Sequence, residues 1–142
     1  MSILKPLHGS EPGLFPRLAV LCDQDYAQEI QIVCGTQAAA DPALHVVGLL
    51  KRRYPKTQID VVVDERSHGT NRKISNLVNM EALPRHDLII LSDSDILVDE
   101  QFISRVAAEM EDLGPGVLSC ANYGLAAGGT SRSERQSHAS AP

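Results

Sequence analysis

The stretch of sequence that decides the fold is Leu-Ile-Ile-Leu-Ser-Asp-Ser-Asp-Ile-Leu-Val, residues 88–98. Its four leading apolar residues are too few for a helix and predict a buried strand of a parallel sheet. Asp93 and Asp95 follow where that strand would end, and open α/β folds bind ligands at this carboxyl edge. Two carboxylates separated by one residue can converge on a hard divalent cation that also binds substrate phosphates. The stretch therefore favours a metal-assisted, nucleotide-sugar-binding site.

The Asp-x-Asp pattern is a weak signal when it stands alone. A second copy, Asp23-Gln24-Asp25, follows no predicted strand and is expected to lie in the loop after a helix. Asp93 and Asp95 differ from this second copy because they follow directly after a predicted strand. The alternative for this pair is a solvated turn that leads into the next helix.

Composition limits the classes of protein to which the chain can belong. Its 142 residues are 43% hydrophobic, which suffices for one domain with a core, and its net charge of −5 argues against a nucleic-acid partner. The three cysteines and five histidines show no metal-ligand spacing, so we expect reduced thiols and no zinc site. There is no signal peptide and no apolar run near the ~20 residues of a membrane span, so a cytoplasmic location is expected.

Strand and helix patterns alternate along the chain. Strands are predicted at residues 2–4, 29–34, 58–63, 88–91 and 117–120. Helices are predicted at 11–22, from Asp41-Pro42 to the basic cluster 51–56, at about 71–80, and from Asp99 to Gly114. This order predicts a doubly wound α/β domain with a mostly parallel sheet over residues 1–121.

The end of the chain has a different composition. From residue 122 onward Gly, Ala, Ser and Arg dominate, which predicts a disordered tail over 122–142. A sheet that stops after its fifth strand leaves an apolar edge uncovered, so self-association through that edge is expected.

Four motifs, in this order, resemble a known family: Ile-Leu-Lys-Pro-Leu-His-Gly (3–9), Gln37 with Asp-Pro-Ala (41–43), His-Gly-Thr-Asn-Arg-Lys-Ile-Ser-Asn-Leu (68–77), and Ser-Asp-Ser-Asp-Ile (92–96). On these motifs, residues 2–120 resemble the N-terminal half of a ceramide glucosyltransferase-like protein, and are especially similar to hopanoid-biosynthesis glycosyltransferases. The resemblance implies an inverting nucleotide-sugar glycosyltransferase with a GT-A fold, Rossmann-like and here incomplete.

The resemblance also implies a donor site for a UDP-sugar with Mg²⁺ or Mn²⁺. By it, Asp41 contacts the nucleotide base, Asp93 binds the ribose and the metal, and Asp95 binds the metal that bridges the diphosphate. The other donor residues that it implies are Lys5, Pro6 and Leu7 at the uridine pocket, and Gly69, Asn71 and Lys73 near the donor. Three of these have structural alternatives: Asp41 and Asn71 as helix caps, and Lys73 as the partner of an acid.

The chain departs from the family in one respect. The family's catalytic-base aspartate and its Gln-x-x-Arg-Trp motif lie downstream of the equivalent of residue 120, and this chain contains no Trp. We therefore expect that residues 1–142 alone do not transfer sugar. By the resemblance, full-length relatives are membrane-anchored, with the catalytic domain on the cytoplasmic side, and glycosylate a lipid, either ceramide or a hopanoid.

Two other hypotheses follow from the sequence. The first is a non-catalytic nucleotide-binding or interaction fragment. The second is a phosphatase of the haloacid-dehalogenase type, with Asp93 as the nucleophile. In that type the motif follows the first strand, whereas here it follows the fourth.

Overall fold

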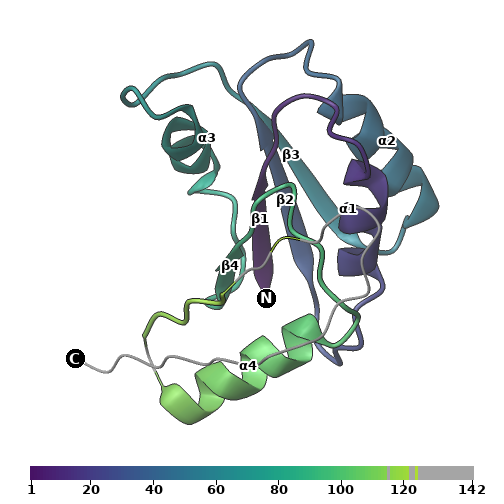
Figure 1. The fold of residues 1–142 in the computed structure, drawn as a ribbon, viewed down its shortest axis with the longest axis vertical. Helices are drawn as coiled ribbons and strands as arrows, with labels where there is room; N and C mark the ends of the chain where they lie inside the picture. Colours follow the sequence, from purple (N-terminus) through teal and green to yellow (C-terminus); the bar gives the residue numbers. More distant parts are fainter. Residues whose placement is uncertain (115, 122–123, 125–142) are drawn as a thin grey trace. The chain divides into compact units, whose positions relative to one another are not determined.

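The computed structural model describes residues 1–114, 116–121 and 124 (Figure 1). The chain divides into two compact units, residues 1–104 and 105–142, and the sheet belongs to the first. The strands are β1 (Ser2–Pro6), β2 (Gln31–Thr36), β3 (Gln58–Val63) and β4 (Ile89–Leu91). The helices are α1 (Leu14–Cys22), α2 (Ala43–Arg53), α3 (Arg72–Met80) and α4 (Phe102–Leu113).

The four strands form one parallel sheet in the order β3-β2-β1-β4. The strand β1 lies between β2 and β4, with Lys5 opposite Cys34 and Leu4 opposite Leu91. Because all strands run the same way, the loops that follow them begin at one edge of the sheet. The predicted α/β fold with a parallel sheet is confirmed.

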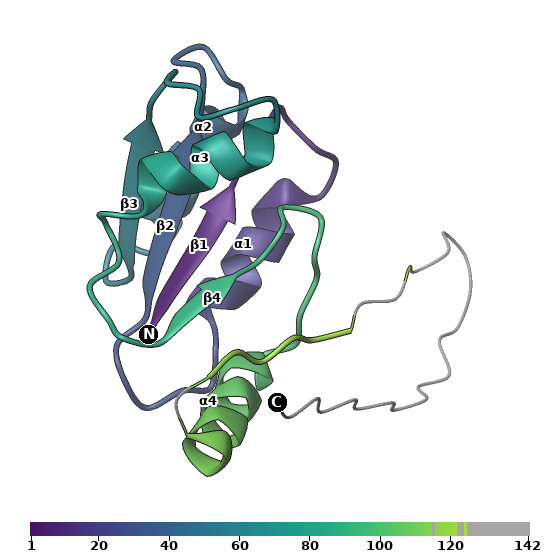
Figure 2. The same cartoon turned by 90° about the vertical axis from the view of Figure 1, so that its left-hand side faces the viewer.

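Helices cover both faces of this sheet. Figure 2 shows α3 in front of the sheet, with α1 and α2 behind it. Between α3 and the sheet, Met80 of α3 packs in one core cluster with Leu4 of β1 and Val33 of β2. On the other face α1 buries Leu14, Leu18 and Leu21, which are the three residues whose spacing predicted that helix.

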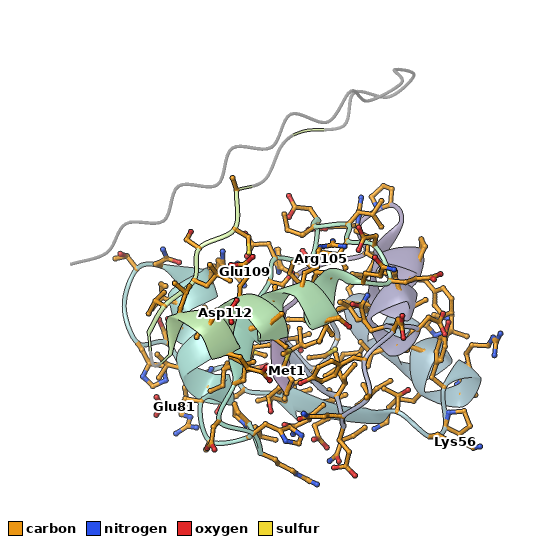
Figure 3. All side chains as sticks on the ribbon, turned by 90° about the horizontal axis from the view of Figure 1, so that it is seen from below. Met1, Lys56, Glu81, Arg105, Glu109 and Asp112 are labelled. Carbon is orange, nitrogen blue, oxygen red and sulfur yellow. The ribbon has the colours of Figure 1, made fainter. Side chains whose placement is uncertain are left out.

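The edge of the sheet opposite the carboxyl ends contains the start of the chain. Figure 3 views this edge and labels Met1 near its middle, with Lys56 and Glu81 to either side. The Met1 ammonium donates a hydrogen bond to the Glu29 carbonyl (2.9 Å). Met1 therefore lies at the edge of the sheet opposite to the loops that follow the strands.

The predicted fifth strand is wrong. Residues 117–120 form no strand, and Val117 is 97% exposed. A strand exists only where a neighbour accepts and donates its backbone hydrogen bonds, and the apolar composition of this segment does not supply one. The predicted disordered tail, 122–142, lies outside the described residues except for Gly124.

The strand β4 is an edge strand of the described sheet. Ile89 is 48% exposed and Leu91 is 64% exposed, so this edge presents apolar side chains to solvent. Self-association through the edge stays a prediction. Among the described residues, no helix combines the length and the apolar character that crossing a membrane requires.

Candidate functional site

A cavity of about 360 Å³ opens at the carboxyl edge of the sheet. Segments that follow β1, β2 and β4 contribute to it, together with the first turns of α3. The lining residues are Pro6, Leu7, His8, Glu11, Gln37, Arg72, Lys73, Asn76, Asp93, Ser94 and Asp95. The structure thus places both predicted metal ligands in one cavity with Pro6, Leu7 and Lys73. The other predicted donor residues, Lys5, Asp41, Gly69 and Asn71, do not line it.

The acidic loop, residues 92–95, continues directly from β4. The Ser92 amide donates to the Leu4 carbonyl (3.1 Å), so parallel pairing extends one residue beyond the strand. The chain then turns, and the Ile96 amide donates to the Asp93 carbonyl (3.3 Å). The Asp93 side chain is 48% exposed, which leaves this carboxylate open to a ligand.

Lys73 forms an ion pair with the acidic loop. Its Nζ lies 2.5 Å from Oδ1 of Asp93, and the lysine side chain is 53% exposed. Lys73 lies in the first turn of α3, where the Asn71 side chain caps the helix by accepting a hydrogen bond from the Ile74 amide (3.1 Å). Both structural alternatives are therefore observed. Lys73 pairs with an acid and also lines the cavity, and Asn71 caps α3.

The buried face of α3 combines the apolar Met80 with three polar residues. Ser75, Asn76 and Asn79 are 1%, 4% and 8% exposed, whereas Ile74 is 51% exposed. The Asn76 amide group donates to the Gly35 carbonyl (2.8 Å) at the end of β2. Buried polar groups need such partners, so hydrogen bonds to the sheet contribute to seating this helix.

Hydrogen bonds from α3 also fix the loop that precedes it. The Asn79 amide group donates to the carbonyls of Asp64 (3.0 Å) and Arg66 (3.1 Å). The His68 amide donates to Oγ of Ser75 (2.9 Å), and the His68 ring nitrogen Nε2 lies 2.8 Å from Oδ1 of Asn79. These contacts position the segment that contains Gly69, a residue with a φ of +142°.

Close approach between α3 and β2 requires a glycine at position 35. A Cβ there would lie 2.3 Å from Sδ of Met80 and 2.6 Å from Oδ1 of Asn76. Both distances are far below van der Waals contact, so any side chain would push the helix away from the sheet. Gly35 therefore keeps α3 close to β2 and so sets how far Asn76 lies from the sheet.

Asp41 is largely buried and binds backbone amides. Its carboxylate accepts hydrogen bonds from the Gly9 amide (3.0 and 3.1 Å) and from the Ala43 amide (2.9 Å). Nδ1 of His8 lies 3.7 Å from the same carboxylate. Asp41 thus joins the loop after β1 to the start of α2. The N-cap of α2 is Pro42, so Asp41 lies one residue before the N-cap that it was predicted to occupy and still binds the first helical amide. Its predicted contact with a nucleotide base stays a prediction.

Lys5 lies beneath the acidic loop and is 1% exposed. Its Nζ donates hydrogen bonds to Oγ of Ser92 (2.9 Å) and to the carbonyl of Asp93 (2.6 Å). Burial lowers the pKa of Lys5 to about 8, while the negative charges of Asp93 and Asp95 oppose that shift. The predicted role of Lys5 as part of a uridine pocket stays a prediction.

Two buried side-chain atoms in the cavity-lining residues have no hydrogen-bond partner within the described part of the chain. They are Oε2 of Glu11 and Oδ1 of Asn76. The other carboxylate oxygen of Glu11 accepts a hydrogen bond from Oγ of Ser94 (3.0 Å). No motif pointed to Glu11, which lies outside all four, whereas Asn76 lies within the third.

The donor atoms of the cavity fit a hard cation. Asp93 and Asp95 offer carboxylate oxygens, which Mg²⁺ and Mn²⁺ prefer. Over the described ranges no group of three His, Cys, Asp or Glu side chains is placed to hold a metal ion. The set therefore suits a cation that takes its remaining ligands from phosphate and water.

Comparison with solved structures gives the fold family. A structure of S. aureus TarS superposes with a TM-score of 0.61 at 20% identity, covering 83% of this chain and 38% of that one. A second TarS structure, in complex with UDP-GlcNAc, gives a TM-score of 0.61 at 21% identity over 78% of this chain and 31% of that one. The likeness shows that the chain has the GT-A fold.

Comparison with curated proteins gives relatives of one kind. The ceramide glucosyltransferase of Komagataella phaffii is 28% identical over 109 residues, 74% of this chain and 21% of that protein. Ceramide glucosyltransferase 1 of Caenorhabditis elegans is 24% identical over 110 residues, 78% of this chain and 23% of that protein. The chain thus spans between a fifth and a quarter of the length of these relatives. The family Glycosyl transferase family 21 matches residues 1–132, and the chain belongs to that family.

Proposed function

We propose that the cavity binds the diphosphate of a UDP-sugar together with Mg²⁺ or Mn²⁺, as the donor half of a glycosyltransferase site. The observation that supports this most directly is the convergence of Asp93, Asp95 and Lys73 on one cavity at the carboxyl edge of a parallel sheet. Open α/β folds bind ligands at this edge. The UDP-GlcNAc complex of TarS, which shares the fold, supports a UDP-sugar as the donor.

Each group of lining residues has a part in this proposal. Asp93 and Asp95 hold the cation through their carboxylates, and the cation neutralises the charge that builds on the departing diphosphate. Lys73 donates to phosphate oxygens, because an ammonium binds a phosphate as a point charge. Pro6 and Leu7 supply an apolar wall for the nucleoside.

The acceptor is proposed from the relatives. Because the curated relatives are ceramide glucosyltransferases, we propose a membrane lipid of the ceramide type as the acceptor of the full-length protein. A hopanoid acceptor and a membrane anchor stay predictions from the resemblance.

Calorimetry with UDP-GlcNAc and UDP-glucose tests the donor site. We expect binding that requires Mn²⁺ and that is lost in Asp95→Ala, because the cation bridges this carboxylate and the diphosphate. The matched control is Asp25→Asn in the other Asp-x-Asp segment, where the aspartate side chain is exposed. Undiminished binding by Asp95→Ala, or no binding by the unmodified chain, would refute the proposal. Binding of UDP without dependence on Mn²⁺ would favour the non-catalytic nucleotide-binding fragment instead.

A further inference from the structure

We infer that Lys5 is a positioning residue, a buried ammonium that holds the acidic loop so that Asp93 and Asp95 face the cavity. The inference rests on the proposed function, because it concerns the cation site of that same cavity. It assigns Lys5 a role through other residues, without contact to the donor.

The position of Lys5 in the sheet explains its reach. Leu4 pairs with Leu91, the last residue of β4, so Lys5 lies level with the start of the acidic loop. Its side chain spans to the two residues that follow β4, where Nζ donates to Oγ of Ser92 and to the carbonyl of Asp93. One side chain from the centre of the sheet thereby binds the loop through both a side chain and the backbone.

A lysine in this place is costly unless it does something that an apolar residue cannot do. Lys5 is 1% exposed, and within the described residues no carboxylate lies in ion-pair range of its ammonium. An ammonium taken out of water loses hydration that two neutral acceptors replace only in part. The compensation is electrostatic, since two carboxylates that repel each other at the loop gain a fixed positive charge beneath them.

A second contact fixes the same loop. Oγ of Ser94 donates to Glu11, which lies in the segment between β1 and α1. The two serine hydroxyls of the loop thus bind Lys5 and Glu11, and Ser94 lines the cavity together with the two aspartates. Both serines hold the loop, whereas only the aspartates offer carboxylates to a cation.

The test compares Lys5→Met with the unmodified chain of 142 residues. Methionine has a similar length and no charge, so it removes the desolvation cost of the ammonium together with its two hydrogen bonds, and the two effects on stability oppose each other. We expect a melting temperature that does not fall. The Mn²⁺ affinity, measured by electron paramagnetic resonance of the free ion, should fall by about tenfold, since two charge-assisted hydrogen bonds to the loop are lost. Amide exchange should become faster at residues 93–96 and stay unchanged at Ile32 and Val33.

Two further variants calibrate this result. Ser94→Ala removes the contact to Glu11, a single hydrogen bond, and should weaken Mn²⁺ binding by roughly threefold. Lys51→Met removes an exposed lysine at the end of α2 and should leave Mn²⁺ binding unchanged. If Lys5→Met lowers the melting temperature and leaves the Mn²⁺ affinity of the folded protein unchanged, Lys5 is only a structural residue and the inference is wrong.

The outcomes also separate this inference from the proposed function. An unmodified chain that binds Mn²⁺ neither alone nor together with UDP-GlcNAc refutes both. Binding by the unmodified chain, with equal binding by Lys5→Met, overturns the role of Lys5 and leaves the donor site standing.

Discussion

Replacing Lys73 with methionine should change two affinities in opposite directions. In this structure the Lys73 ammonium lies 2.5 Å from the Asp93 carboxylate that is proposed to hold the cation. A metal ion that binds without nucleotide must therefore compete with the lysine for the same oxygen atoms. Lys73→Met removes the competitor, so Mn²⁺ alone should bind more tightly. The same change removes a donor to the diphosphate, so a UDP-sugar should bind more weakly.

The exposure of the pair sets the size of each effect. Both side chains are about half exposed, and an ion pair of this kind contributes roughly 0.2–1 kcal/mol. The Mn²⁺ affinity should accordingly rise by no more than about fivefold. A hydrogen bond between charged groups contributes about 1.5–3 kcal/mol, so the UDP-sugar affinity should fall by between about 10-fold and 150-fold.

Calorimetry measures both constants on the same samples. Mn²⁺ is titrated without nucleotide, and UDP-GlcNAc is then titrated at saturating Mn²⁺. Lys56→Met, which changes an exposed lysine near the opposite edge of the sheet, controls for the loss of one positive charge (Figure 3). The gain in Mn²⁺ affinity should shrink in high salt, because salt screens an exposed pair. We propose that Lys73 pairs with the Asp93 carboxylate in the free protein and with the diphosphate when the donor binds. If both affinities rise or both fall in Lys73→Met, this proposal is refuted.

Three other predictions concern packing, capping and the thiols. Gly35→Ala should destabilise the fold by about 1–3 kcal/mol, seen as a lower melting temperature, because the added methyl overlaps the α3 side chains beneath it. Asp41→Ala should lower the free energy of unfolding by about 1 kcal/mol and leave Mn²⁺ affinity unchanged, and a loss of UDP affinity in the folded variant would instead support a contact with the base. Burial raises the pKa of Cys22 and of Cys34 to about 12, so at pH 8 they stay protonated and a thiol reagent should modify the exposed Cys120 first. All three thiols should react quickly in urea, and fast native labelling of two or more would contradict this prediction.

The order of strands and helices along the chain could be predicted from local sequence. The Val-rich stretch at 58–63 became β3 with the predicted bounds, and the leucine spacing in 11–22 identified the buried stripe of α1. These signals succeed because periodicity reports which side chains face a core. The fifth strand failed because its existence depends on a hydrogen-bonded neighbour, and no local pattern reports one.

The candidate site could be predicted only in part, for a related reason. Placing Asp93 and Asp95 at the cavity needed no more than a strand end and a parallel sheet. The contacts of Lys5 join residues 87 and 88 positions apart, and that of Glu11 joins residues 83 apart. Such pairings follow from the order of the strands, which the sequence does not state.

The helix α3 shows why apolar periodicity becomes misleading next to a site. Its apolar Ile74 is half exposed, while Asn76 and Asn79 are buried. Asn76 donates to a carbonyl of β2, and Asn79 donates to carbonyls of the loop after β3. In the loop after β3 the chain leaves the ladder, and the carbonyls of Asp64 and Arg66 accept hydrogen bonds from the Asn79 side chain. A helix that covers this edge therefore needs amide groups on part of its inner face. The same groups put polar atoms beneath the cavity, so the hydrogen bonding that closes the fold also supplies the polarity that a diphosphate site requires.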